Sequence, residues 1–440
     1  MNIKELTILG GGPAGLSVGY YAKKKGMSFK IYEASDRIGG NCQTIKAGDF
    51  LFDSGAHRFH DKDKEATREI KTLLGDELKL INIPSQIYFK GKYIDFPLSP
   101  LNLLKELGIK QFTLSAFQIL ISKIAPGKID SFKDLVLNEY GRKIAANFLL
   151  NYSEKLWGLP AEKLSPLVAG KRLKGLNLKT FLVESILGSK AKTTHLDGAF
   201  YYPENGIGSI FEKMTDFCHH ENIKKNNRIS KILHDDGVIK AIELNNKQII
   251  EVSEVINSLP LNLFIKLLYP QPPQKIIALS EKLSFRNVVL LAVFLNKEKV
   301  SGNGSLYFPE KIYSFNRIYE PRNRSIKMAP AGKTSLIIEI PCQTESEIWA
   351  GSNEDITAGI IDQLTGLNLF TKEEIIGSAV YKIKNAYPVL ETEYEKKVEI
   401  LTNYLTGFEN LKITGRSGKF AYTHIHDMMR SGKEIIDSFN

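Results

Sequence analysis

The sequence has few of the residues that mark several common classes of protein. Its 440 residues include three cysteines, Cys42, Cys218 and Cys342, and none of them lies in a CxxC pair. A disulfide-stapled scaffold, a zinc ribbon and a dithiol redox site are therefore excluded, and a reducing, cytoplasmic location is expected. We expect the cysteines to be small core residues.

Long apolar runs are also missing. The most apolar stretches, residues 112–121 and 287–295, are about half as long as the ~20 residues that a membrane-spanning helix needs. The apolar run near the N-terminus is short and leads into a glycine cluster, which does not fit a signal peptide. We therefore expect no integral membrane segment.

Charge of one sign is not concentrated anywhere in the chain. The 59 Lys and Arg against 49 Asp and Glu give a formal net charge of +10, but the basic residues are scattered and no nucleic-acid-binding motif occurs. We therefore expect no nucleic-acid partner, and the charge suits a solvated lysine-rich surface or a groove for phosphates. No metal site is expected, because no CxxC pair is available to bind zinc.

The N-terminal region does contain a glycine-rich turn between two short strands. Residues 3–9 are typical of a buried strand, a helix follows the turn, and a second strand closes at Glu33. The turn holds a GxGxxG sequence, Gly10, Gly12 and Gly15, and Glu33 follows 18 positions after its last glycine. Such glycines allow a tight turn and close approach of a pyrophosphate, and the acid accepts ribose hydroxyls. This pattern predicts an α/β, Rossmann-like dinucleotide-binding domain, and the acid argues against NADP.

The residues after Glu33 narrow the choice of cofactor. Arg37, Gly39 and Gly40 complete an ExxxRxGG pattern that begins at Glu33. This extension resembles that of the large FAD family that includes amine oxidases, protoporphyrinogen oxidases and phytoene desaturases. The resemblance implies FAD as cofactor, bound by a domain that is built from discontinuous segments.

Two later segments fit further parts of such a discontinuous FAD-binding domain. Residues 229–258 predict a hairpin that turns at residues 235–237, followed by a short strand. The C-terminal strand, loop and helix carry Gly415, Arg416 and Asp427, which we expect at the cofactor. A helix N-terminus near Asp427 would present N–H groups to the flavin edge.

Between these segments the pattern changes from helical to strand-rich. The predicted division is residues 1–90 for the first part of the FAD-binding domain, 91–190 for a mainly helical insertion, 191–260 for the second part of the FAD-binding domain, 261–384 for an antiparallel-sheet substrate domain, and 385–440 for the C-terminal part of the FAD-binding domain.

A more specific signal is the GAHRFH segment at residues 55–60. It is similar to the glycine–x–His–x–Phe–His segment of bacterial UDP-galactopyranose mutases, in which the first histidine, His57 here, lies beside the flavin. Three further segments fit the same family, and their matching residues are Trp157 with Arg172, Tyr307 with Arg317, and Tyr387 with Arg416 and Tyr422. The resemblance implies that Trp157 lies near the nucleotide and that the other substrate residues, Arg172, Tyr307, Arg317, Tyr387 and Tyr422, bind its diphosphate. His57, Arg172 and Arg317 are the candidate catalytic residues.

These residue types suit a diphosphate on chemical grounds as well. A nucleotide-sugar diphosphate carries about two negative charges, and arginines make charge-assisted bonds to it worth roughly 1.5–3 kcal/mol each. Tyrosines donate hydrogen bonds without adding charge. A cluster of both residue types beside a flavin is therefore suited to hold a pyrophosphate leaving group.

The main hypothesis is an FAD-dependent nucleotide-sugar mutase that interconverts pyranose and furanose rings. By resemblance, the reduced flavin N5 forms an adduct with the sugar, NAD(P)H is the candidate reductant, and the pathway is polysaccharide biosynthesis. One alternative is an FAD-dependent oxidoreductase of the amine oxidase or protoporphyrinogen oxidase type, which the overall layout and residues 313–340 fit equally. Another is a non-catalytic FAD-binding protein. The sugar, the base and the presence of a homo-oligomer stay open.

Overall fold

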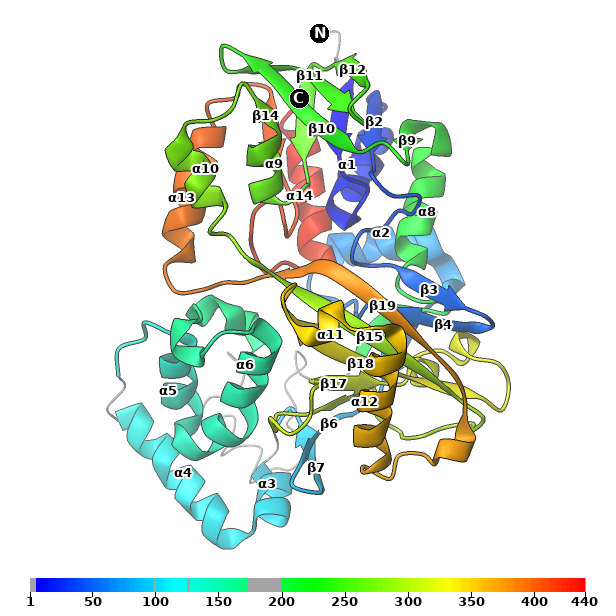
Figure 1. Ribbon diagram of the computed structural model, residues 1–440, viewed down its shortest axis with the longest axis vertical. Helices are drawn as coiled ribbons and strands as arrows, with labels where there is room; N and C mark the ends of the chain where they lie inside the picture. Colours follow the sequence, from blue (N-terminus) through cyan, green and yellow to red (C-terminus); the bar gives the residue numbers. More distant parts are fainter. Residues whose placement is uncertain (1–4, 99, 125–126, 173–198, 440) are drawn as a thin grey trace.

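The structure, a computed structural model, describes residues 5–98, 100–124, 127–172 and 199–439. A parallel five-stranded sheet with the order β20-β13-β1-β2-β9 forms its upper part in Figure 1. Its strands are β1 (Leu6–Leu9), β2 (Phe29–Tyr32), β9 (Ile223–Lys224), β13 (Glu254–Asn257) and β20 (Leu411–Ile413). The chain thus enters this sheet from three separated segments, which confirms the expected Rossmann-like, discontinuous α/β fold.

Helices cover this sheet closely. All four residues of β1 are buried, as in parallel strands that have helices on both faces. The helix α1 (Pro13–Lys24) follows β1, and the C-terminal helix α14 (Ile425–Asp437) packs against it. A Cβ atom on Gly432 would lie 2.9 Å from the backbone of Ser17, so glycine permits this close approach. The helix α8 (Ser209–Cys218) also contacts α1.

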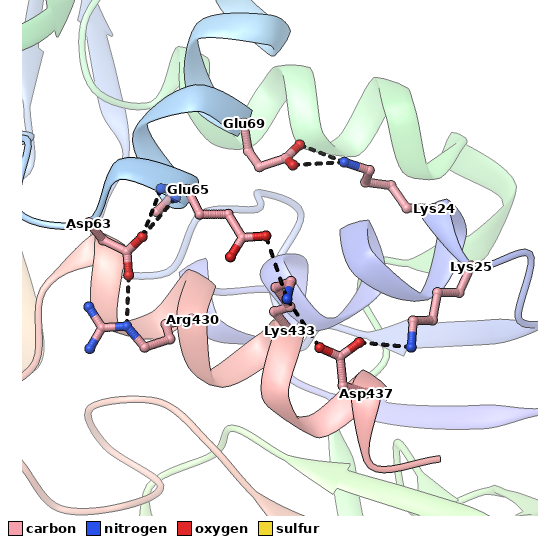
Figure 2. A network of polar contacts seen from close by, with 9 residues as sticks. Lys24, Lys25, Asp63, Glu65, Glu69, Arg430, Lys433 and Asp437 are labelled. Atoms are coloured by element: carbon pink, nitrogen blue, oxygen red, sulfur yellow. Dashed lines mark hydrogen bonds and ion pairs between the residues drawn. The ribbon is translucent and has the colours of Figure 1, made fainter. Parts of the chain in front are cut away.

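Salt bridges tie α14 to the neighbouring helices, as Figure 2 shows. The carboxylate of Asp63 caps α2 (Lys64–Leu74) by accepting from the amides of Glu65 and Ala66, each at 3.0 Å, and it also accepts from Arg430 of α14 at 2.7 Å. The remaining pairs are Lys433–Glu65, Lys433–Asp437, Lys25–Asp437 and Lys24–Glu69. Exposed pairs contribute little singly, but together they hold the middle and the end of α14 against α2 and the end of α1.

The predicted hairpin lies beside the parallel sheet. Strands β10 (Ile229–Asp235) and β11 (Val238–Leu244) pair antiparallel, as expected for a turn at residues 235–237. They form a four-stranded sheet with β12 (Gln248–Glu251) and β14 (Leu268–Tyr269). The helices on this side are α9 (Leu261–Leu267), α10 (Gln274–Ser280) and α13 (Tyr394–Leu405).

A seven-stranded sheet with the order β19-β15-β18-β17-β16-β6-β7 forms the second unit. Its strands are β15 (Phe285–Leu295), β16 (Ser305–Tyr307), β17 (Arg317–Tyr319), β18 (Thr334–Cys342), β19 (Ile375–Pro388), β6 (Ser85–Phe89) and β7 (Lys92–Phe96). Neighbouring strands in this sheet run antiparallel, except for β16 and β6, which are parallel. Residues 85–96, on both sides of the boundary predicted at residue 90, thus form a hairpin within this sheet. The other domain boundaries stay predictions.

The two faces of this sheet are covered by different elements. Because side chains alternate along a strand, Val289 and Leu291 of β15 pack toward α12 (Asn353–Thr365), and the short α11 (Glu347–Ala350) packs on the same face. Val288 and Leu290 pack on the opposite face, toward the hairpin of β3 (Thr44–Ala47) and β4 (Phe50–Asp53). Strands β5 (Leu78–Asn82) and β8 (Ala199–Pro203) form a further antiparallel pair.

A helical unit lies beside the seven-stranded sheet, at the lower left of Figure 1. It contains α3 (Pro100–Leu107), α4 (Ile109–Ile124), α5 (Phe132–Ile144) and α6 (Asn151–Trp157), and a π-helical turn at residues 145–150 leads into α6. These helices lie in the range 91–190 that was predicted as a mainly helical insertion, of which residues 173–190 lie outside the described part; the insertion stays a prediction. In the described ranges, no helix is both long and apolar enough to cross a bilayer.

Candidate functional site

The glycine turn after β1 is arranged as a phosphate-binding turn requires. Gly10 has φ +100°, and a Cβ atom on Gly15 would lie 1.9 Å from the carbonyl oxygen of Gly10, so both positions need glycine. At the end of β2, Glu33 accepts a hydrogen bond from the amide of Gly11 at 2.8 Å and another from the amide of Ser35 at 2.9 Å. The carboxylate is thus held where the ribose of a bound dinucleotide would lie.

The second glycine pair packs directly on the first turn. The amide of Gly39 donates to the carbonyl of Gly11 at 2.9 Å, and a Cβ atom on Gly40 would lie 3.1 Å from Cα of Gly12. Arg37 is exposed, and its guanidinium donates to the carbonyl of Thr44 at 2.8 Å. The structure therefore brings the two predicted glycine motifs together, with Arg37 bracing the loop that joins them.

The C-terminal segment reaches the same region. Gly415 has φ +84°, and a Cβ atom there would lie 2.9 Å from that of Ala14 at the start of α1. Asp427 is in the first turn of α14, where its carboxylate accepts from the amide of His424 at 2.9 Å. Asp427 is thus a helix-capping residue, and its contact with the cofactor stays a prediction.

His57 lies in a partly buried loop after β4 that contacts strand β18 and Arg324. The amide of Ala56 donates to Glu339 at 2.7 Å, and Arg324 donates to the carbonyl of His57 at 3.1 Å. The ring atom Nδ1 is 4.0 Å from Sγ of Cys42. The other ring nitrogen, Nε2, is buried and has no hydrogen-bond partner among the described residues. It is thus available to a bound group.

The surroundings of His57 are cationic. Burial lowers the pKa of His57 to about 3, and the charges of Arg416, Arg317 and Arg324 act in the same direction. The imidazole is therefore neutral near pH 7. Burial also raises the pKa of the neighbouring Cys42 thiol to about 12, so this cysteine stays protonated. Three guanidinium groups around one buried point create a positive potential that favours an anion.

Arg317 is held by a carboxylate on the adjacent strand. Arg317 of β17 and Glu339 of β18 are paired in register, and Nε of Arg317 donates to Oε2 of Glu339 at 2.8 Å. A second donor, Nη2, bonds to the same oxygen. Burial opposes the charge of Arg317, but the carboxylate outweighs this effect and raises its pKa. Because the other oxygen of Glu339 accepts from Ala56, one side chain positions both Arg317 and the His57 loop.

Aromatic side chains from four segments converge next to Arg317. The ring of Tyr152 on α6 is 5.7 Å from that of Tyr307 on β16. The ring of Trp157, at the end of α6, is 6.0 Å from that of Tyr387 on β19 and 5.8 Å from that of Tyr422. The charge of Arg317 is close enough to affect the pKa values of Tyr152 and Tyr387, which places the guanidinium beside these phenols.

Arg416 belongs to this aromatic cluster. Its guanidinium is 5.0 Å from the ring centre of Tyr422 and 5.9 Å from that of Tyr387, and it donates to the carbonyl of Thr423. Burial raises the pKa of Tyr387 to about 12 and also raises that of Tyr152. These phenols are therefore protonated near neutral pH, and each has a proton to donate.

Two buried cations position α6 against the sheet. The ammonium group of Lys155 donates to the carbonyls of Phe308 at 2.8 Å, Glu310 at 2.9 Å and Phe315 at 2.6 Å. Burial lowers the pKa of Lys155 to about 7, while the three carbonyls favour its charged form. At the same C-terminal end of the helix, Arg286 of β15 donates to two of the last carbonyls of α6, each at 3.2 Å. The helix that carries Tyr152 and Trp157 is thus fixed relative to β16 and β17.

The structure brings most of the sequence-predicted substrate residues together. The converging residues are His57, Trp157, Tyr307, Arg317, Tyr387, Arg416 and Tyr422. The side chain of Arg172 lies outside the described part of the chain. Sequence reasoning missed Tyr152, Lys155 and Glu339. A signal existed for Glu339, because it is the single charged residue in the nine-residue, fully buried strand β18.

These residues fit a bound FAD. The glycine turns leave space that a Cβ atom would fill, the carboxylate of Glu33 is held against the first turn, and Nε2 of His57 is a buried polar atom with no partner among the described residues. In a bound state, the first turn would hold the pyrophosphate and the first turn of α14 would lie toward the flavin ring.

Comparisons with known proteins agree with this arrangement. The profile of the flavin containing amine oxidoreductase family matches residues 13–381. Coproporphyrinogen III oxidase from Bacillus subtilis is 20% identical, over 98% of this chain and 97% of its own. A crystal structure of reduced UDP-galactopyranose mutase superposes with a TM-score of 0.87 at 18% identity, over 100% of this chain and 94% of that one. Putrescine oxidase bound to putrescine superposes with a TM-score of 0.68 at 17% identity, over 99% and 98%.

The two solved structures are less than 20% identical to this chain, so they show a shared fold. The family profile matches most of the chain and therefore shows the family. The protein is a flavoenzyme that belongs to the flavin containing amine oxidoreductase family.

Proposed function

We propose that this flavoenzyme is a nucleotide-sugar mutase, similar to UDP-galactopyranose mutase, that interconverts the pyranose and furanose forms of a sugar. The observation that carries the proposal is the convergence of Arg317 and Arg416 with four tyrosines and a tryptophan beside His57. This surface offers guanidinium charge and phenolic donors, which is the chemistry that a diphosphate needs.

The substrate is held through its diphosphate. Arg317, fixed by Glu339, binds one phosphate, and the phenols of Tyr307 and Tyr387 donate to its oxygens. Arg172 is the second arginine of the diphosphate site. Trp157 and Tyr152, on the α6 helix that Lys155 and Arg286 fix, contact the nucleotide. The departing nucleoside diphosphate is thereby kept in place until the sugar has changed its ring.

The catalytic role of His57 is to orient the cofactor. Its neutral imidazole would contact a bound flavin through Nε2, and the cations around it would favour the anionic form of the reduced ring. When bound and reduced, a flavin held by the glycine turns and by His57 would supply the nucleophile for the ring exchange. No net oxidation occurs, so NAD(P)H is needed only for occasional reduction.

One rival function has an observation in its favour. Coproporphyrinogen III oxidase from Bacillus subtilis resembles this chain over nearly the full length of both proteins. An oxidase of that type takes hydride from its substrate and passes the electrons to oxygen, so it works from the oxidised flavin and produces peroxide.

The deciding experiment uses the redox state of the flavin. Dithionite-reduced protein is incubated with UDP-galactopyranose or UDP-galactofuranose, and the two ring forms are separated by chromatography. The proposal predicts exchange with reduced protein and none with oxidised protein. Peroxide from oxidised protein and a porphyrinogen or an amine, without ring exchange, would establish the rival.

A further inference from the structure

The helix α4 has an outer face that nothing in the described structure covers. Its inner face packs against α5: Ser115 and Ile119 are buried, and Gln118 accepts from the amide of Lys143 at 3.0 Å. A Cβ atom on Gly141 of α5 would lie 3.0 Å from the side chain of Gln118, so the two helices are in close contact. In Figure 1, α4 forms the outer edge of the helical unit, away from both large sheets.

The outer face of α4 is apolar. Phe117 is 60% exposed and Ile109 is 73% exposed. The other exposed apolar side chains on the helix are Leu114, Leu120 and Ile121. Leu114, Phe117 and Ile121 have the spacing of one helical stripe, opposite the buried Ser115 and Ile119. An exposed apolar face of this kind marks an interaction surface.

The segment that carries this face has charges of one sign. No Asp or Glu occurs between residues 107 and 129, whereas Lys110, Lys123 and Lys128 do. Lys110 is exposed and lies four residues before Leu114, on the same stripe. Apolar side chains with lysines and no carboxylate are complementary to an anionic, apolar partner.

We propose that the outer face of α4 docks the protein on an anionic phospholipid surface. The helix has 16 residues, a length of about 24 Å, which is shorter than the ~30 Å hydrocarbon core of a bilayer. It therefore lies along the surface, with Phe117, Leu120 and Ile121 in the acyl boundary and Lys110 at the headgroups. A symmetric dimer fits less well, because it would place the same acid-free, lysine-bearing face against its own copy.

The test is co-sedimentation of the flavin-bound, full-length protein with phosphatidylcholine vesicles that contain or lack phosphatidylglycerol. We expect salt-sensitive binding to the anionic vesicles, about fivefold weaker for each lysine charge removed, and at least tenfold weaker binding for the double variant Phe117→Ser, Leu120→Ser. The matched control is Ile249→Ser on β12, because Ile249 is also 60% exposed but lies on another part of the molecule. This control is expected to bind like the wild type.

Three results would overturn the proposal. They are no binding of the wild type to anionic vesicles, equal binding of the double variant, and a dimer in light scattering that the double variant dissociates. The proposal is independent of the reaction, because it rests on residues outside the site, so ring exchange in solution is expected to be unchanged in the double variant.

Discussion

The pair formed by Arg317 and Glu339 can be tested by removing its charges one at a time and then together. The two side chains are 14% and 4% exposed. Replacing either by glutamine leaves the other as an unpaired buried charge, which costs about 3–5 kcal/mol of folding free energy. The double variant Arg317→Gln, Glu339→Gln removes both charges. Its loss of folding free energy is therefore far smaller than the sum of the losses in the two single variants.

Denaturant unfolding of the flavin-bound protein measures this coupling. We expect an interaction free energy of about 3 kcal/mol between the two positions, at the upper end of the range for contacting residues. Arg68→Gln, a change at an exposed arginine of α2, is the control and should leave stability within about 0.5 kcal/mol of the wild type.

The same variants separate stability from binding. Glu339→Gln keeps the guanidinium but loosens its position, so it should weaken UDP binding less than Arg317→Gln does. Arg317→Gln removes charge-assisted bonds worth roughly 1.5–3 kcal/mol, so calorimetry should show UDP binding about 10- to 150-fold weaker with the yellow flavin retained. Additive stability losses, or equal UDP affinity in Arg317→Gln and wild type, would refute this reasoning.

Three further changes probe other parts of the site. Gly15→Ala places a methyl group 1.9 Å from a carbonyl oxygen, so the protein should purify without flavin absorbance, whereas Gly359→Ala, with open space around it in α12, should keep its flavin. Between pH 6.5 and 3, His57 takes up a proton in the unfolded chain but not in the folded protein. The stability of the folded protein therefore falls as the pH falls, by up to about 1.4 kcal/mol per pH unit. Denaturant unfolding of His57→Gln should show a shallower loss of stability over this range. Lys155→Met removes three hydrogen bonds that fix α6, so calorimetry should show weaker UDP binding at unchanged flavin content.

The parts of the fold that sequence reasoning predicted correctly are encoded locally. The turn from Gly10 to Gly15 and the acid at Glu33 lie within one strand–helix–strand unit, so their spacing alone defines their arrangement. The hairpin at residues 235–237 is likewise a short-range pattern. The convergence of Trp157, Tyr387 and Tyr422 was expected only through resemblance to a family, because these residues are far apart in the chain.

The features that were missed depend on long-range packing. The hairpin β6–β7 joins the seven-stranded sheet through β16, more than 200 residues away, and nothing near residue 90 encodes that partner. Lys155 has the sequence context of an exposed helical lysine, and its burial results from three carbonyls of the β16–β17 region. Such contacts follow from how the segments pack and not from local spacing.

The most direct test of a diphosphate site beside the flavin is a titration of the flavin absorption spectrum with UDP, with uridine and a porphyrinogen as comparisons. UDP is expected to perturb the spectrum with saturation, uridine far more weakly, and Arg317→Gln should abolish most of the UDP effect. If UDP leaves the spectrum unchanged while the porphyrinogen bleaches the flavin, the site binds and oxidises a different substrate, and the mutase account is wrong.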